Sequence, residues 1–342
     1  MQGREPPSIT KGAIATALVL SAMWGLNIVG IKVALAAFPP IWNAFWRALL
    51  GLPVIWVWAR AGRIRLRPAP EEARPLAILG GVFAVQIILL NTSIGWTSAA
   101  YASVLLNAAP VYINVIAHFA VPGDRLSWRR LVGLALAFCG VAVAMLGRPD
   151  PSFAARPALG NALASFTAMI MAGRMVYTQR LVQTIDSTKA MFWQVGLSVP
   201  VFLVCAALTE PMLVGPLTIG PVLSGLYCAV GVVGVAFVLW VRLLKTNSPG
   251  LLSVFVFPTP IFGVLFSALI YGESPSADLI VGLLGVAFGI LLVTLERRRD
   301  ASRQVANEGH GAESPVAGAD LSHRPSPPHR DPDQSRVGAL RG

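Results

Sequence analysis

Residues 99–120 read AAYASVLLNAAPVYINVIAHFA, and this stretch holds no Lys, Arg, Asp or Glu. An α-helix needs about 20 mainly apolar residues to cross the hydrocarbon core of a bilayer. The run is continuously apolar rather than alternating, which favours a helix over a strand of a membrane barrel. The stretch therefore predicts a membrane-spanning helix, although Ser, Asn, Pro and His interrupt its apolar side chains.

Further apolar runs surround this stretch and are separated from it by charges and turn residues. The whole chain is 55% hydrophobic and 13% charged, whereas soluble domains carry about 25% charged residues. We therefore predict an all-α integral membrane protein of ten transmembrane helices. The expected helices cover residues 12–37, 41–59, 76–96, 99–120, 129–147, 157–180, 188–208, 219–243, 249–271 and 277–295.

The basic residues lie mainly between the apolar runs, so the net charge of +11 indicates membrane topology rather than a nucleic-acid partner. If residues 1–11 are cytoplasmic, the outer segments contain only Arg148 and Arg156. The positive-inside rule then predicts a protein of the cytoplasmic membrane with both termini in the cytoplasm. The inner segments hold Arg4, Lys11, Arg60, Arg63, Arg65, Arg67, Arg74, Arg125, Arg129, Arg130, Arg180, Lys189, Arg242, Lys245, Arg297, Arg298 and Arg299.

The chain after the last apolar run is rich in Pro, Gly, Ser, Asp and Arg, a composition that predicts disorder. Cys139, Cys205 and Cys228 fall in apolar runs and indicate no disulfide framework. We predict neither a cofactor nor a metal site. The predicted parts are a cytoplasmic N-terminus (1–11), a first five-helix unit (12–147), an outer linker (148–156), a second five-helix unit (157–295) and a disordered cytoplasmic tail (296–342).

The two five-helix units are related by an internal repeat. Because five is an odd number, the second unit must enter the membrane from the opposite face, which makes the repeat an inverted one. Such repeats can hold one site near the midplane and expose it to either side in turn. The matches are Ser98, Ser103, Val104 and Pro110 with Ser248, Ser253, Val254 and Pro260; Gly123, Ser127, Val132, Gly133 and Gly140 with Gly272, Ser276, Val281, Gly282 and Gly289; and Phe45-Trp46 with Phe192-Trp193.

The helix over 99–120 carries a polar stripe formed by Ser103, Asn107, Pro110, Asn114 and His118. Their spacing places them within about 80° of one another around the helix. Amides inside a membrane also join helices through hydrogen bonds, which is the alternative interpretation. Four polar groups and a proline on one face favour a surface that lines the path of a solute, with an apolar wall from the second repeat.

Other polar side chains are predicted at a similar depth. Trp24 and Asn27 lie near the middle of the first helix, where a tryptophan either lines a pocket or fills the core. Arg47 either neutralises an anionic group of the solute or joins helices, and both roles remain open. Arg174 and Lys32 either line the path or extend towards lipid headgroups.

The sequence resembles the EamA-type transporters of the drug/metabolite transporter superfamily over residues 12–295. The resemblance rests on the segments Trp24-Gly25-Leu26-Asn27, Lys32-Val33-Ala34-Leu35, Phe45-Trp46-Arg47, Ala102-Ser103-Val104-Leu105-Leu106-Asn107-Ala108-Ala109-Pro110 and Gly272-Glu273. It implies two inverted repeats that move amino acids, other metabolites or drugs, commonly outward. Pro122-Gly123-Asp124 departs from the family, which usually has a Gly-Glu pair at that place.

We therefore predict a secondary transporter that exports small organic solutes by alternating access, with a solute and the lipid bilayer as its partners. A homodimer is compatible with the sequence. His118 is the side chain best placed to couple transport to protons, although uniport or exchange ranks equally. An intramembrane hydrolase that uses His118 and Cys139, and a membrane protein that transports nothing, are the alternatives.

Overall fold

The computed structural model describes residues 10–120, 128–246 and 258–311, and within these ranges the secondary structure is helical, with no strand. Among these residues, six helical stretches are long and apolar enough to cross a membrane, and one of them, Ile219–Trp240, joins three consecutive helical elements. Four shorter apolar stretches accompany them. The helices are α1 (Lys11–Ala34), α2 (Pro40–Ala61), α3 (Pro70–Trp96), α4 (Ala99–Leu106), α5 (Ala109–Ala120), α6 (Trp128–Leu146), α7 (Pro157–Leu181), α8 (Ser187–Thr209), α9 (Ile219–Leu226), the π-helix η1 (Tyr227–Ala236), α10 (Phe237–Thr246), α12 (Thr259–Tyr271) and α13 (Ala277–Gly311).

The helix predicted over 99–120 is divided into α4 and α5, which end and begin on either side of Asn107 and Ala108. Pro110 has no backbone N–H to give to the preceding turn, so a regular helix cannot continue through it. The amide N–H of Val111 bonds to the carbonyl of Ala108, 2.9 Å away, in a tight turn instead. The polar stripe therefore follows a broken helix.

Two other predicted helices also differ from their expected form. The run over 219–243 contains the ten-residue π-helix η1 between α9 and α10, a conformation often found at functional sites. Helix α13 continues to Gly311, so residues 296–311 are helical where we expected disorder. The added segment contains four Arg, two Glu and two Ala, which favour helices. The rest of the predicted tail lies outside the described residues.

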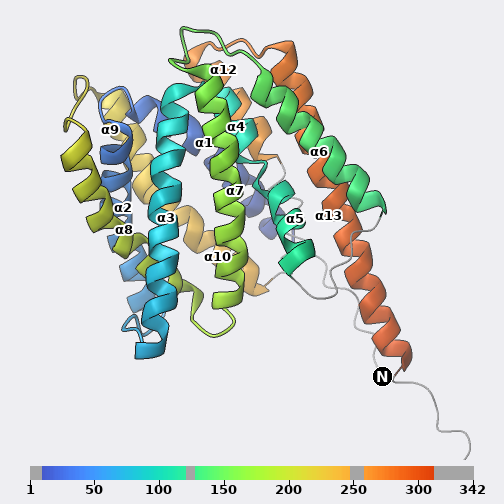
Figure 1. The fold of residues 1–342 in the computed structure, drawn as a ribbon. Coiled ribbons are helices and arrows are strands. Elements are labelled where there is room, and N and C mark those ends of the chain that lie inside the picture. The colour runs from blue at the N-terminus through green and yellow to red at the C-terminus, as the bar shows by residue number, and fades with distance from the viewer. Residues whose placement is uncertain (1–9, 121–127, 247–257, 312–342) are drawn as a thin grey trace, which may run out of the picture. The chain divides into compact units, whose positions relative to one another are not determined.

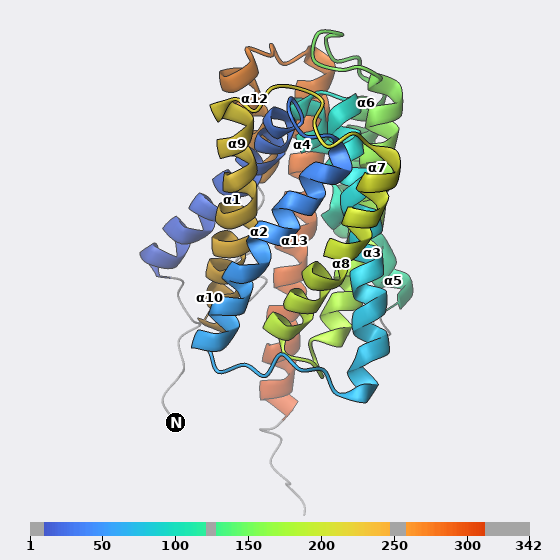
Figure 2. The same cartoon turned by 90° about the vertical axis from the view of Figure 1, so that its left-hand side faces the viewer.

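The helix bounds and the packing both follow the repeat. The C-terminal ends of α1 and α7 lie 147 residues apart, at Ala34 and Leu181, and so do the starts of α2 and α8, at Pro40 and Ser187. Helix α2 packs beside its equivalent α8, and α4 packs beside α12, which is the counterpart of α5 in the other repeat (Figure 2). Contacts between non-equivalent helices occur in two matching copies. Helix α1 packs on α12, and their counterparts α7 and α5 pack on each other. This exchange of partners is the pattern of a two-fold relationship.

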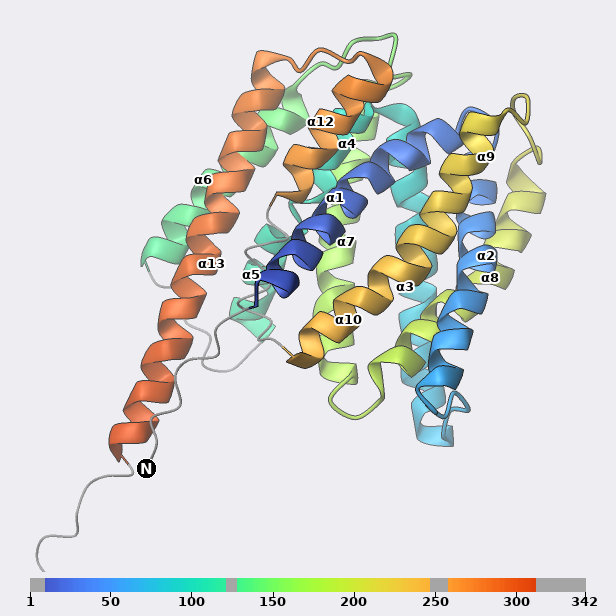
Figure 3. The same cartoon turned by 180° about the vertical axis from the view of Figure 1, so that it is seen from behind.

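The first helices of the two repeats run in opposite directions, since α1 rises in the view of Figure 3 and α7 descends in that of Figure 1. Helices α3 and α7 lie side by side in Figure 1, and they share many close contacts. The large apolar side chains that face outward suit a lipid surface, as the expected membrane location requires.

Glycines of α6 and α13 bring these two helices into backbone contact. A Cβ atom on Gly140 would lie 2.5 Å from the amide nitrogen of Val286 and 2.7 Å from the carbonyl oxygen of Gly282. A Cβ atom on Gly289 would lie 2.5 Å from the carbonyl oxygen of Gly133. Small residues allow such close approach between membrane helices. Gly133 and Gly140 correspond in the repeat to Gly282 and Gly289, so each meets the counterpart of the other.

Candidate functional site

Arg47 of α2 and Asn27 of α1 meet inside the helix bundle. The Arg47 side chain is 8% exposed, and its Nη2 atom donates to Oδ1 of Asn27 at 3.5 Å. Within the part of the chain that the structure describes, the Nε and Nη1 atoms of Arg47 have no hydrogen-bond partner. A buried charged group without partners costs free energy, so its retention calls for a ligand or a partner that completes its bonds.

The second repeat supplies a wall of this site through η1. The thiol of Cys228, which is buried, lies 3.6 Å from the carbonyl oxygen of Asn27 and donates to it. The hydroxyl of Tyr227 donates to the carbonyl of Met23 at 2.8 Å. On the same helix as Arg47, Gly51 lies against η1, because a Cβ atom on it would lie only 2.7 Å from the side chain of Val233. The free guanidinium atoms therefore lie at a contact between the repeats.

The residues around the break between α4 and α5 bond mainly to their own segment. The Ser103 hydroxyl donates to the carbonyl of Ala99 at 2.7 Å and packs close to Gly263 of α12. The Asn107 side chain donates to the carbonyl of Ser103 at 2.7 Å, so it satisfies a backbone group near the end of α4. The side chains of Asn114 and His118 lie outside the described residues.

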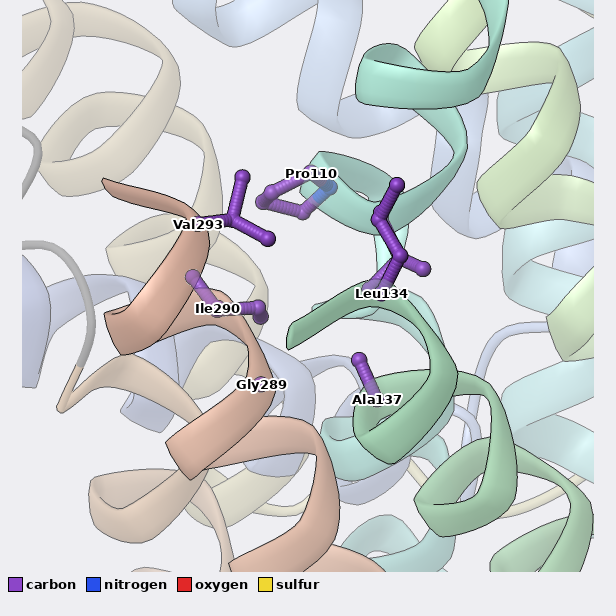
Figure 4. A pocket seen from close by; sticks show the side chains of 7 residues that line it. Pro110, Leu134, Ala137, Gly289, Ile290 and Val293 are labelled. Carbon is purple, nitrogen blue, oxygen red and sulfur yellow. The ribbon is translucent and has the colours of Figure 1, made fainter. Parts of the chain in front are cut away.

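Pro110 borders a small apolar cavity of about 20 Å³ between α5, α6 and α13. Figure 4 shows Pro110 opposite Val293 and Ile290, with Leu134 and Ala137 on the adjoining helix. The space is about large enough for one water molecule, but its walls offer no polar side chain. The cavity therefore reflects imperfect packing beside the broken helix rather than a solute site.

Trp24 packs against the second repeat. Its ring lies edge-on to that of Trp240 of α10, with the ring centroids 5.3 Å apart. Both rings border a buried apolar cluster that includes Leu20 and Ala236. This contact fits the core-filling role that the sequence left open, although Trp24 lies one turn from Asn27.

Arg174 of α7 occupies a different environment from Arg47. Its Nε atom donates to Oε1 of Gln86 at 2.5 Å, and its Nη1 atom donates to Oε1 of Gln194 at 3.1 Å. The ring of Phe83 lies under the guanidinium, with 5.3 Å between Cζ and the ring centroid. Both glutamines are buried, at 2% and 7% exposed. Arg174 is therefore bound within the protein by α3 and α8.

Lys32 reaches the C-terminal end of α3. Its Nζ atom donates to the carbonyl oxygens of Ile94, Gly95 and Thr97, at 2.8, 3.2 and 2.7 Å. The lysine borders an open groove of about 410 Å³, whose other walls are mainly apolar. A cation is favourable at this place, because the last carbonyls of a helix carry partial negative charge. Lys32 thus fixes the junction of α1 and α3.

Several buried polar residues were not predicted as site residues. Gln86 and Gln194 bind Arg174, and the Asn161 side chain bonds to Thr97 and to carbonyls at the end of α6. Glu273 is 5% exposed and accepts a hydrogen bond from the Ser267 hydroxyl at 2.6 Å. It follows Gly272, whose φ of 67° ends α12 and favours glycine. For the two glutamines and Asn161, the signal in the sequence was an amide side chain within an apolar run.

Known proteins resemble this chain over most of its length. An uncharacterized transporter of Archaeoglobus fulgidus is 24% identical over 81% of this chain and 95% of its own length. A probable amino-acid metabolite efflux pump of Salmonella typhimurium is 25% identical over 81% of this chain and 92% of its own length. A crystal structure with 20% sequence identity covers 84% of this chain and 99% of its own, with a TM-score of 0.61, and thus has a similar fold.

The model of the EamA-like transporter family matches the chain twice, over residues 11–146 and 158–295. These two ranges agree with the two five-helix units expected from the internal repeat. Together they include nearly all of the described helices and both arginine sites. The chain therefore belongs to the EamA-like transporter family and is a multi-pass membrane transporter with two EamA repeats.

Proposed function

We propose that the protein is a secondary transporter of the cytoplasmic membrane that exports small organic solutes bearing a carboxylate, amino acids among them. The carrying observation is Arg47, a buried guanidinium with two nitrogen atoms that have no partner among the described residues. A guanidinium presents its N–H groups as a fork that matches the two oxygens of a carboxylate. The name of the Salmonella relative, an amino-acid metabolite efflux pump, supports the same solute class.

Alternating access is the mechanism that we infer for this transport. The repeats meet in a two-fold pattern, with the equivalent helices α2 and α8 paired, and Arg47 lies where η1 of the second repeat faces α1 and α2 of the first. Rocking one repeat against the other would open this contact to one side of the membrane and then to the other. Both termini lie in the cytoplasm in this proposal, as the basic residues of the inner segments require.

Counterflow in proteoliposomes tests the proposal. Vesicles that contain the purified chain and an unlabelled amino acid should accumulate the same amino acid in labelled form from the outside. Testing each of the twenty common amino acids in this way identifies the solute. Empty vesicles, and vesicles with amino-acid amides in place of the acids, are the controls. If no member of the panel accumulates above the empty-vesicle level, the proposed solute class is wrong.

Arg47→Gln should reduce carboxylate transport about 10- to 100-fold, because a hydrogen bond to a charged group contributes about 1.5–3 kcal/mol. The loss should appear as a raised half-saturating concentration for the acid and as a much smaller change for its amide. Arg60→Gln is the matched control, since Arg60 lies exposed at the end of the same helix and stacks on Trp56. Equal losses in the two variants would contradict a role for Arg47 in binding.

Solvent access at the helix break tests the mechanism. A cysteine placed at Asn107, with the three native cysteines changed to alanine, should react with a membrane-impermeant maleimide, and the solute should alter that rate. Asn107 is only partly buried and lies next to the break. If the new cysteine stays unreactive from both sides of the membrane, with and without solute, then the path does not pass α4.

The enzyme alternative receives no support from its proposed thiol. Cys139 lies on the exposed face of α6. The nucleophile of an intramembrane active site would instead be expected inside the bundle. The relatives that match most of the chain are called transporters or an efflux pump.

Proton coupling by His118 stays a prediction. His118→Gln should then keep solute binding but lose its dependence on a pH gradient.

A further inference from the structure

The two arginines of the candidate site occupy related positions in the repeat. Arg174 follows Asn27 by 147 residues, and Gln194 follows Arg47 by the same interval, which also relates the bounds of the helices that carry them. Each repeat therefore holds one arginine and one amide at the same two places. The first repeat has its arginine on the second helix, whereas the second repeat has it on the first.

Both arginine–amide pairs are bonded. The Nη2 atom of Arg47 lies 3.5 Å from Oδ1 of Asn27, and the Nη1 atom of Arg174 lies 3.1 Å from Oε1 of Gln194. Asn27 and Arg174 each lie seven residues before the last residue of their helix, about 10 Å along its axis. Helices α1 and α7 run in opposite directions (Figures 1 and 3). The two pairs are therefore displaced towards opposite faces of the bundle.

The pairs differ in what completes the guanidinium. Two amide oxygens, from Gln86 and Gln194, accept the Nε and Nη1 hydrogens of Arg174. The same interval of 147 residues leads from Gln86 to Val233 in η1, which has no side-chain acceptor and packs near Gly51, one turn from Arg47. Arg47 therefore lacks the oxygen that Arg174 receives.

A carboxylate would offer an arginine two oxygens in one plane, and Gln86 and Gln194 together offer Arg174 two oxygens in its place. The three residues come from α3, α7 and α8, so a relative movement of these helices would separate them. After such a separation, N–H groups of Arg174 would lack acceptors, as the Nε and Nη1 atoms of Arg47 do in the present state. The amide oxygens thus stand where the oxygens of a ligand would bind.

We propose that Arg174, Gln86 and Gln194 form a second binding site for the carboxylate of the solute, closed here by the two amide oxygens. This inference rests on the proposed function and extends it, because it gives the path two anion sites related by the repeat. Arg47 receives the carboxylate in the state seen here, and Arg174 receives it when the repeats have rocked to the other state. Phe83, under the guanidinium, forms an apolar wall for the rest of the solute.

Binding of labelled L-leucine to the purified full-length chain, with competition by L-leucinamide, tests this site without requiring transport. Arg174→Gln should lower the preference for leucine over leucinamide about 10-fold or more, as expected for a lost hydrogen bond to a charged group. Arg180→Gln, an exposed position on the same helix, should leave that preference as it is. A helix contact without a ligand role would change the affinity for both compounds by the same factor.

Gln86→Leu gives the opposite sign and separates the two roles further. Removing one competing oxygen should strengthen leucine binding about 2- to 10-fold, as expected for the loss of one ordinary hydrogen bond that closes the site. If Arg174 only joins helices, Gln86→Leu should instead weaken binding or lower the melting temperature without any gain for leucine. Should Arg174→Gln fail to fold, the sign of the Gln86→Leu effect decides alone.

The outcomes separate this inference from the function beneath it. Suppose that the native chain binds leucine, that Arg47→Gln weakens this binding, and that Arg174→Gln leaves the preference for leucine over leucinamide unchanged. This result would overturn the second site and leave the proposed function standing. A native chain that neither binds leucine nor shows counterflow with any amino acid of the panel would overturn both. A lowered preference in Arg174→Gln and tighter binding in Gln86→Leu would support two sites.

Discussion

Gly140→Ala should destabilise the protein by about 3 kcal/mol or more and sharply lower the yield of folded chain. The added Cβ atom would lie 2.5 Å from a backbone nitrogen and 2.7 Å from a backbone oxygen of α13. Overpacking of a core side chain commonly costs about 1–3 kcal/mol, and here the neighbours are backbone atoms that cannot rotate away. Thermal unfolding of the purified protein in detergent, followed by tryptophan fluorescence and by size-exclusion chromatography, measures the effect.

Gly81→Ala is the matched control for this prediction. Gly81 lies inside α3, and a Cβ atom there would meet no atom within 4 Å. The same substitution should stabilise the protein by up to about 1 kcal/mol, because alanine favours the helix more than glycine does. If the two variants melt at the same temperature, the close contact between α6 and α13 does not contribute to stability.

Lys32→Met should lower the free energy of unfolding by about 2–4 kcal/mol. The ammonium group serves three carbonyl oxygens at the end of α3, and methionine would fill similar space without any donor. Unsatisfied buried acceptors cost about 1–3 kcal/mol each, and water from the neighbouring groove would recover part of that loss. The measurement is the same melting experiment, combined with limited proteolysis of the segment that follows α3.

Lys11→Met provides the comparison, since Lys11 is the exposed first residue of α1. A surface change of this kind should stay within about 0.5 kcal/mol. Lys32→Arg should fall between the two, because it keeps the charge but changes the geometry of the donors. A melting temperature for Lys32→Met equal to that of Lys11→Met would mean that the carbonyls need no partner from α1.

Membrane fold and repeat could be predicted from the sequence because both depend on local pattern. Apolar runs of sufficient length indicate spans, and the duplicated residues indicate two units, and the family match confirms that organisation. The split at Asn107 and the π-helix η1 were not foreseen. Pro110 showed where a helix could break, but whether it would kink or divide depends on the bonds that neighbours offer.

The candidate site was predictable only in part. Asn27 and Arg47 stood out as polar side chains deep in apolar runs, and they do meet. Gln86 and Gln194 were equally deep but carried no charge, so nothing in the sequence distinguished them from amides that join helices. Their role is defined by Arg174, which is 88 residues from one and 20 from the other. Contacts of that range depend on tertiary packing, which a local pattern does not specify.

The glycine contact between α6 and α13 has a consequence for how the molecule is built. Gly133 touches Gly289 and Gly140 touches Gly282, so two copies of one patch meet in antiparallel orientation and exchange partners. That is the geometry of an isologous interface, the kind that holds symmetric dimers together. A single five-helix unit would therefore already carry the complementary surface for a second unit inserted upside down, and the tandem chain encodes both copies in one polypeptide.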